Sequence, residues 1–147
     1  MASKTKYAPG VPASRSLALV LAAAGLATGC GTAGSNSSKN FPGSKQAVAQ
    51  SVEDLESAAR KSDETTICND LLATPLIATI RSSGQSCTTA ISHALDDADT
   101  FDLTVKSVTV AGNSATAVVE SKRKKPAQDT FKLVKEGGRW KIASLGA

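Results

Sequence analysis

The side chains best suited to acid–base chemistry are one histidine and a group of aspartates. His93 is the single histidine and follows Ile91 by two positions, so on a helix it points away from the apolar side. We interpret it as a solvated surface residue rather than a catalytic acid or base. Four aspartates lie close together, at Asp96, Asp97, Asp99 and Asp102. Their proximity suggests calcium, but the loop has neither the glycine nor the final glutamate of a calcium loop, so we predict a polar helix end and no metal site.

Two further motifs have a functional and a structural interpretation. Gly84-Gln-Ser-Cys-Thr88 is only loosely similar to a nucleophile elbow, because it lacks the second glycine and follows no strand. Ser86 is better explained as the cap of a helix. The four adjacent charges of Lys122-Arg-Lys-Lys125 could contact anionic lipid or a cell-wall polymer. We interpret them instead as a solvated hairpin loop.

The first thirty residues have the pattern of an export signal. Residues 1–15 are polar and basic, and residues 16–28 contain no charge. That run is short for a membrane span and right for the core of a signal peptide. It leads into Leu26-Ala-Thr-Gly-Cys30, which resembles the lipobox of bacterial lipoproteins. The resemblance implies that Cys30 is acylated (diacylglyceryl and palmitate) and becomes the mature N-terminus; in an ordinary cleaved secretion signal, Cys30 would be incidental.

The other two cysteines are interpreted as a structural disulfide. Three cysteines leave one over in an oxidising compartment, but acylation of Cys30 leaves Cys68 and Cys87 as a pair. Both lie on apolar faces of expected helices. Metal binding and a reactive thiol are the alternatives, yet two cysteines 19 residues apart with one distant histidine match no zinc spacing. A bond between them would close a loop of about 20 residues and stabilise the fold by roughly 3 kcal/mol.

The charge of the chain does not favour nucleic acid as a partner. Lys and Arg total 17 against 13 Asp and Glu, a net charge of +4. Three of the basic residues, Lys4, Lys6 and Arg15, precede Cys30, whereas all acidic residues follow it. The remainder carries 14 − 13 = +1. A nearly neutral domain with few aromatic residues has no broad surface for phosphates or stacked bases, so we predict no nucleic-acid partner.

The chain therefore divides into a signal peptide over 1–29, a tether over 30–43 and a folded domain over 44–147. The tether is rich in Gly, Ser and Asn, which predicts a flexible segment with an r.m.s. reach near 20 Å. Apolar residues at spacings of three and four predict a helix over about 45–61. Shorter helices are expected over about 65–73, from Thr74-Pro75 to Gly84, and from Ser86.

After Phe101 the apolar period changes from helical to two, which predicts strands. Alternation predicts four strands, with a change of parity near Ser107 that indicates a bulge. Glycine turns at 111–113 and 136–138 and the polar loop at 122–126 connect them. Helices followed by an antiparallel meander predict an α+β domain, with N-terminal helices packed on one face of a curved, four-stranded antiparallel sheet.

This order resembles the nuclear-transport-factor-2-like, ketosteroid-isomerase-type superfamily, and in particular its small lipoproteins from high-GC Gram-positive (actinobacterial-type) bacteria. The resemblance rests on Thr65-Thr-Ile-Cys-Asn-Asp-Leu-Leu72, Ser86-Cys87, the turn-containing stretch 108–119 and the closing Gly-Gly-Arg-Trp-Lys-Ile142. It covers about 45–146 and implies a cone-shaped pocket between sheet and helices. Enzymes of the superfamily hold in that pocket an Asp base with Tyr or protonated-acid donors, or a His with Tyr. This chain has no Tyr after Cys30, so no catalytic residue is carried over.

Three functions are compatible with these features. The first is a non-catalytic binding or accessory module, held by lipid at the extracytoplasmic face of the bacterial membrane, with an envelope protein or an apolar ligand as partner and no cofactor. The second is a purely structural envelope component without a pocket. The third is an isomerase- or dehydratase-type enzyme, which requires two of four side chains to face one cavity: Asp70, Asp97, Asp102 and His93.

Overall fold

A computed structural model describes residues 36–98, 100–122 and 125–146, which belong to one compact unit. The expected signal peptide (1–29), Cys30 and the first part of the tether lie outside these residues. So do Asp99 and the middle of the loop that contains Arg123 and Lys124. No helix in the described part of the chain is long and apolar enough to cross a membrane.

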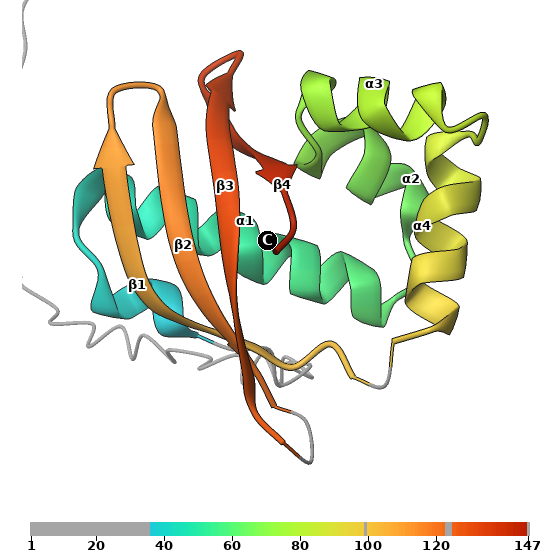
Figure 1. The fold of residues 1–147 in the computed structure, drawn as a ribbon. Coiled ribbons are helices and arrows are strands. Elements are labelled where there is room, and N and C mark those ends of the chain that lie inside the picture. Colours follow the sequence, from blue (N-terminus) through green and yellow to red (C-terminus); the bar gives the residue numbers. More distant parts are fainter. Residues whose placement is uncertain (1–35, 99, 123–124, 147) are drawn as a thin grey trace, which may run out of the picture. The chain divides into compact units, whose positions relative to one another are not determined.

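The first half of the domain is helical, as the apolar spacing predicts (Figure 1). The elements are η1 (Ser37–Asn40), α1 (Gly43–Arg60), α2 (Glu64–Thr66), η2 (Ile67–Leu71), α3 (Thr74–Ser82) and α4 (Cys87–Asp96). Helix α1 buries Val48, Val52 and Leu55 along one side, which is the stripe seen in the sequence. The Ser86 hydroxyl accepts a hydrogen bond from the Thr89 backbone N–H at 3.1 Å, so the predicted cap of α4 is confirmed.

Four antiparallel strands make up the second half: β1 (Leu103–Ala111), β2 (Ser114–Ser121), β3 (Ala127–Glu136) and β4 (Arg139–Ser144). They pair in the order β1-β2-β3-β4. Short turns between consecutive strands enforce this meander, and the glycines in two of them have positive φ. The register of β1 against β2 shifts between Val105 and Ser107, which confirms the bulge predicted from the change of parity.

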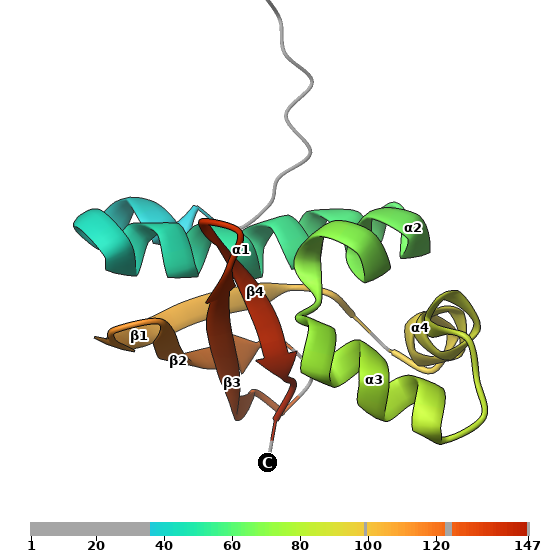
Figure 2. The ribbon, with the colours of Figure 1, turned by 90° about the horizontal axis from the view of Figure 1, so that it is seen from above.

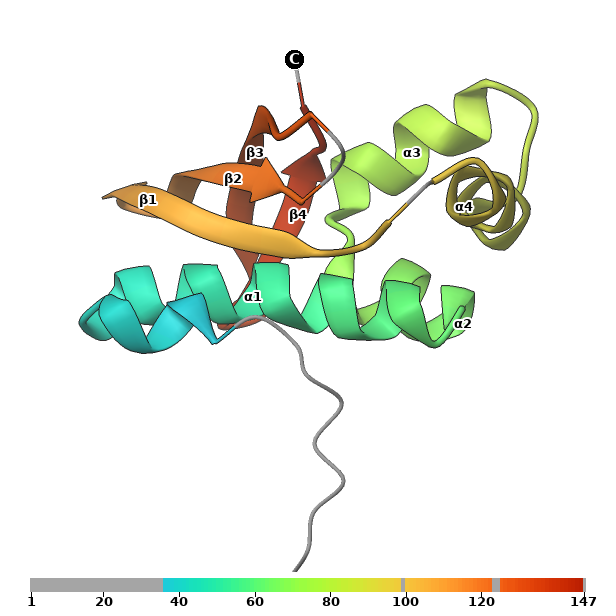
Figure 3. The ribbon, with the colours of Figure 1, turned by 90° about the horizontal axis from the view of Figure 1, so that it is seen from below.

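The helices cover one face and one edge of the curved sheet. Helix α1 runs along the sheet, and α3 and α4 lie beyond its β4 side (Figures 2 and 3). The Ala73 N–H donates to the Ile142 carbonyl at 2.8 Å, and Leu72 forms a parallel bridge with Ile142. The chain between η2 and α3 thereby pairs with part of β4 and limits exposure of that edge. The expected α+β architecture is confirmed.

The tether predicted over 30–43 does not extend that far along the chain. Residues 37–40 form η1, and α1 already begins at Gly43. Ser38 donates from its backbone N–H to Glu53 Oε1 at 2.8 Å and from its hydroxyl to Glu53 Oε2 at 2.7 Å. The Ser37 hydroxyl accepts the Val105 backbone N–H at 3.1 Å. The segment η1 has a composition typical of a linker, yet it is packed against the domain, because its polar groups find hydrogen-bond partners on α1 and β1.

Candidate functional site

A cavity of about 300 Å³ lies between α1, α4 and the sheet. Helix α1 contributes Leu55 and Ala59, and α4 contributes Ile91, Ala94 and Leu95. On the sheet side the lining includes Leu103 of β1 and Phe131 of β3, and the chain end adds Leu145. Most of the lining is apolar. This position and lining match the pocket that the family resemblance implies, and they provide a site for a small apolar molecule.

The segment η2 brings two further apolar side chains to the cavity. It is one turn of π-helix, closed by the Leu72 N–H donating to the Ile67 carbonyl at 3.0 Å. Both Ile67 and Leu72 are almost fully buried and line the cavity. Single π turns of this kind are rare in proteins, but those that occur are often found at functional sites, because the wider turn changes the direction of its side chains.

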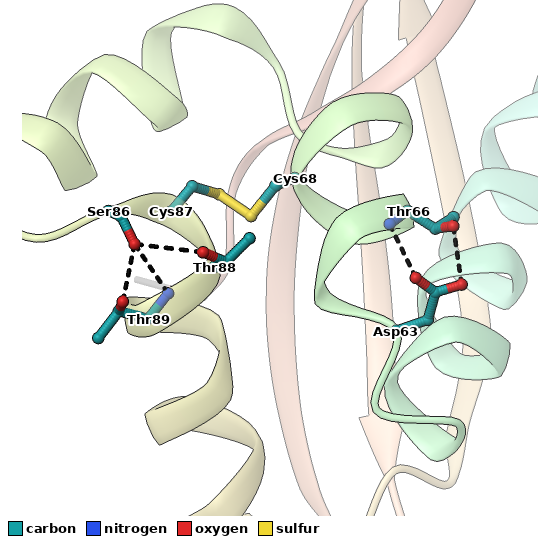
Figure 4. The surroundings of a disulfide bond; sticks show 7 residues. All are labelled: Asp63, Thr66, Cys68, Ser86, Cys87, Thr88 and Thr89. Atoms are coloured by element: carbon teal, nitrogen blue, oxygen red, sulfur yellow. Dashed lines mark hydrogen bonds between the residues drawn. A yellow bond between two sulfur atoms is a disulfide. The ribbon is translucent and has the colours of Figure 1, made fainter.

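The predicted disulfide is present and joins η2 to α4, two of the helical elements in the cavity wall. Cys68 of η2 is bonded to Cys87 in the first turn of α4, with their Cα atoms 6.0 Å apart. Figure 4 shows the bond between these two segments, with the Ser86 cap beside it. Both cysteines are buried. The covalent link holds the start of α4 against η2, and α4 in turn supplies one wall of the cavity.

One buried acidic side chain is part of this mostly apolar wall. Glu56 of α1 is 1% exposed and is the only charged residue among the buried residues that the structure describes. Its Oε1 accepts a hydrogen bond from Arg60 Nη2 at 2.8 Å. Its Oε2 is buried and has no hydrogen-bond partner within residues 36–98, 100–122 and 125–146. A buried carboxylate oxygen without a donor is energetically costly.

Sequence reasoning missed Glu56, although a signal was present. Glu56 follows Val52 by four positions and precedes Ala59 by three, so it lies on the apolar stripe of the expected helix. Arg60, four residues later, makes the pair look like an ordinary ion pair on a helix surface. Only the sheet packed over α1 shows that this face is interior.

The residues named for an enzyme are not brought together. His93 is exposed, as predicted, in a shallow depression with Glu64 and Thr65. Asp70 pairs with Arg139 at 3.0 Å in a different depression. Asp97 ends α4, and Asp102 pairs with Arg60. None of these four side chains is among the residues lining the main cavity.

Comparisons with known proteins agree with this fold. Residues 80–145 match the model of a family described as "Putative lumazine-binding". The matched stretch runs from the end of α3 through α4 and all four strands, whereas α1 and Glu56 precede it. No curated protein matches the sequence.

A solved structure is also similar, that of a SEC-C motif containing protein from Rhodopseudomonas palustris. It is 14% identical, with a TM-score of 0.53, over 69% of this chain and 80% of that one. At this identity the likeness concerns the fold alone. The curved four-stranded sheet with its helices is the expected α+β fold, and together with the family match it is consistent with a nuclear-transport-factor-2-like fold. The description of the family suggests a ligand-binding domain.

Proposed function

We propose that this protein is a non-catalytic binding module, held by lipid at the extracytoplasmic face of a bacterial membrane, that takes up one small apolar ligand. The observation that carries the proposal is the cavity of about 300 Å³ between α1, α4 and the sheet. Its volume is at the lower end of the range for small-molecule sites, which extends over roughly 300–1,000 Å³. The ligand is therefore compact, of the size of one or two fused rings.

The cavity favours binding over a purely structural role. Side chains in a protein interior normally pack to a density that leaves few voids larger than a water molecule. Atoms that line an empty space lose their dispersion contacts, and an occupant restores them. Small residues such as Ala59, Ala94 and Ala98 line this cavity, where larger side chains would fill it. The description of the matched family makes lumazine, a fused-ring heterocycle, the first compound to try.

The arrangement of titratable groups supports a non-catalytic role. General acid–base catalysis needs a proton donor or acceptor within hydrogen-bond reach of the bound substrate. His93, Asp70, Asp97 and Asp102 all lie outside the main cavity lining. Glu56 does line the cavity, and its carboxylate is already bound on one side by Arg60. Asp129 also lines the cavity but is exposed to solvent. The cavity thus offers shape and one buried carboxylate rather than a buried pair of catalytic groups.

The location rests on sequence features. The charge-free run over 16–28 and the Leu26-Ala-Thr-Gly-Cys30 motif support export followed by acylation at Cys30. The disulfide between Cys68 and Cys87 supports an oxidising compartment outside the cytoplasm. These features support a lipoprotein similar to those of high-GC Gram-positive bacteria. Its domain would then be exposed to ligands of the envelope.

Native mass spectrometry of the full chain, purified from its own type of host in mild detergent, tests the binding function. We expect an adduct of one small molecule that leaves on denaturation. Ala94→Trp should abolish the adduct, because Ala94 lines the cavity and the indole ring would occupy it. Ala90→Trp, one turn earlier on α4 and outside the lining, is the matched control and should retain it. A bare wild-type mass that stays unchanged after titration with lumazine and apolar ring compounds would contradict the proposal.

A further inference from the structure

The buried carboxylate of Glu56 restricts the kind of ligand that the cavity can take. Its side chain is 2% exposed, although α1 places it in the wall of a mostly apolar cavity. A carboxylate in such surroundings is stable only when hydrogen-bond donors surround both of its oxygens. The kind of ligand therefore depends on which hydrogen-bond donors the described residues supply to each oxygen of Glu56.

The described residues satisfy only one side of the carboxylate. Arg60 Nη2 donates to Oε1 at 2.8 Å and also pairs with Asp102 Oδ1. Oε2 has no partner among the described residues. Ser121, a buried hydroxyl in the same wall, directs its hydrogen bond to the Ala127 carbonyl at 3.3 Å instead. The described part of the surrounding wall thus does not provide the missing donor.

We propose that Glu56 is the specificity-determining residue of the cavity, and that its ligand is a compact, largely apolar molecule with an N–H or O–H donor for Oε2. This inference rests on the proposed binding function and adds the chemical class of the ligand. A hydrogen bond to a buried carboxylate is stronger than one between neutral groups, so the donor is selected strongly against an analogue that lacks it.

The surrounding charges exclude anionic ligands. Glu56 and Asp102 together carry two negative charges against the one positive charge of Arg60. Asp129 of β3 adds another carboxylate to the lining. An anion would enter a negative environment and offer no donor. Two kinds of ligand group can supply the donor, a neutral ring N–H or a protonated amine. Either one would donate the same hydrogen bond to Oε2.

Three probes of similar size test the inference on the full chain in mild detergent: indole, N-methylindole and benzylamine. Backbone amide NMR signals of the cavity wall report the dissociation constants. We expect indole or benzylamine to bind at least about tenfold more tightly than N-methylindole. In Glu56→Met, which removes the acceptor, this ratio should fall close to one. Asp54→Asn changes the same charge on the exposed side of α1 and should leave the ratio unchanged.

Each outcome is decisive. Detergent takes up part of each probe, to the same extent for every protein variant. The variants are therefore compared by the ratio of the dissociation constants of two probes, not by the individual dissociation constants. Preference for indole identifies a neutral donor, and preference for benzylamine identifies a cationic one; both support the inference. If N-methylindole binds the wild type as tightly as both indole and benzylamine, the inference is overturned while the binding function stays intact, and this test needs no variant to fold. Failure of all three probes to bind overturns it as well, and the native adduct then decides the binding function separately.

Discussion

At the scale of single residues, Asp63 shows how one carboxylate starts a helical segment. Its Oδ1 accepts the Thr66 backbone N–H at 3.0 Å, and its Oδ2 accepts the Thr66 hydroxyl at 2.8 Å (Figure 4). These two hydrogen bonds, the backbone one first, lower the pKa of Asp63 below its ordinary value of 3.8, and the nearby charge of Lys61 adds to the effect. The ionised form is thus the one that the fold prefers.

This preference predicts a pH dependence of stability. The folded pKa of Asp63 is lower than the unfolded one, so its contribution is fully present above about 3.8 and is lost as the pH falls through the folded pKa. Asp63→Asn should lower the urea midpoint at pH 7, and the difference from wild type should shrink below pH 3.8. Urea titrations at a series of pH values measure this. A difference that stays constant down to acidic pH would show that the charge of Asp63 contributes nothing.

Residue identity alone could not reveal the polar contact of the cavity. Cys68 and Cys87 were predictable as a pair, because a disulfide has few alternatives for two cysteines, namely metal binding and a reactive thiol. Glu56 was not, because a Glu followed four residues later by Arg60 is common on solvated helices. Glu56 is buried because the sheet packs over α1, and the strands of that sheet lie far away in sequence, so no local pattern encodes the contact.

At the scale of elements, the disulfide fixes α4 to η2 and so supports one side of the cavity. Cys68→Ser combined with Cys87→Ser should lower the free energy of unfolding by about 3 kcal/mol, because the unfolded chain regains the freedom of the loop that the bond closes. Ligand affinity should fall too, since Ile91 and Leu95 of α4 would be held less firmly. Denaturant titrations with and without reducing agent measure the first effect.

The matched control for this prediction is the double variant itself under reducing conditions. Reductant should destabilise the wild-type protein to the level of the variant and leave the variant unchanged. If the wild-type midpoint does not respond to a reductant that is shown by thiol titration to have opened the bond, the disulfide does not stabilise this fold.

Element prediction succeeded where periodicity and turns act locally. The apolar stripe predicted α1, and alternation with glycine turns predicted the four strands in their meander order. It failed for η1, because the Ser and Asn residues of that segment are typical of linkers. Ser37 and Ser38 are buried through Glu53, which lies 16 and 15 residues away. Such a contact depends on side chains that only the folded α1 brings within reach.

At the scale of the whole molecule, the packing of η1 shortens the chain segment between the folded domain and its proposed anchor. Only residues 31–36 separate Cys30 from Ser37, which hydrogen-bonds to Glu53. The seven steps from Cys30 to Ser37 span at most about 25 Å, even when the chain is fully extended. The fourteen-residue tether expected from composition would allow far more separation. If Cys30 carries the proposed anchor, the segment that joins it to the packed η1 is therefore shorter than composition predicts.

The anchor itself is tested by Cys30→Ser. Two acyl chains on one cysteine give stable membrane attachment, whereas a single chain gives only marginal binding. The wild-type protein should therefore carry the mass of the acyl groups on Cys30 and partition with the detergent phase. The variant should lack that mass and remain uncleaved or appear in the medium, because neither acylation nor the cut before residue 30 can proceed without the thiol. Thr32→Ser, an equally small change two residues later, should behave as wild type. A wild-type mature chain without acyl mass, or a variant that is cleaved and still anchored as firmly as wild type, would make Cys30 incidental and the segment before it an ordinary secretion signal.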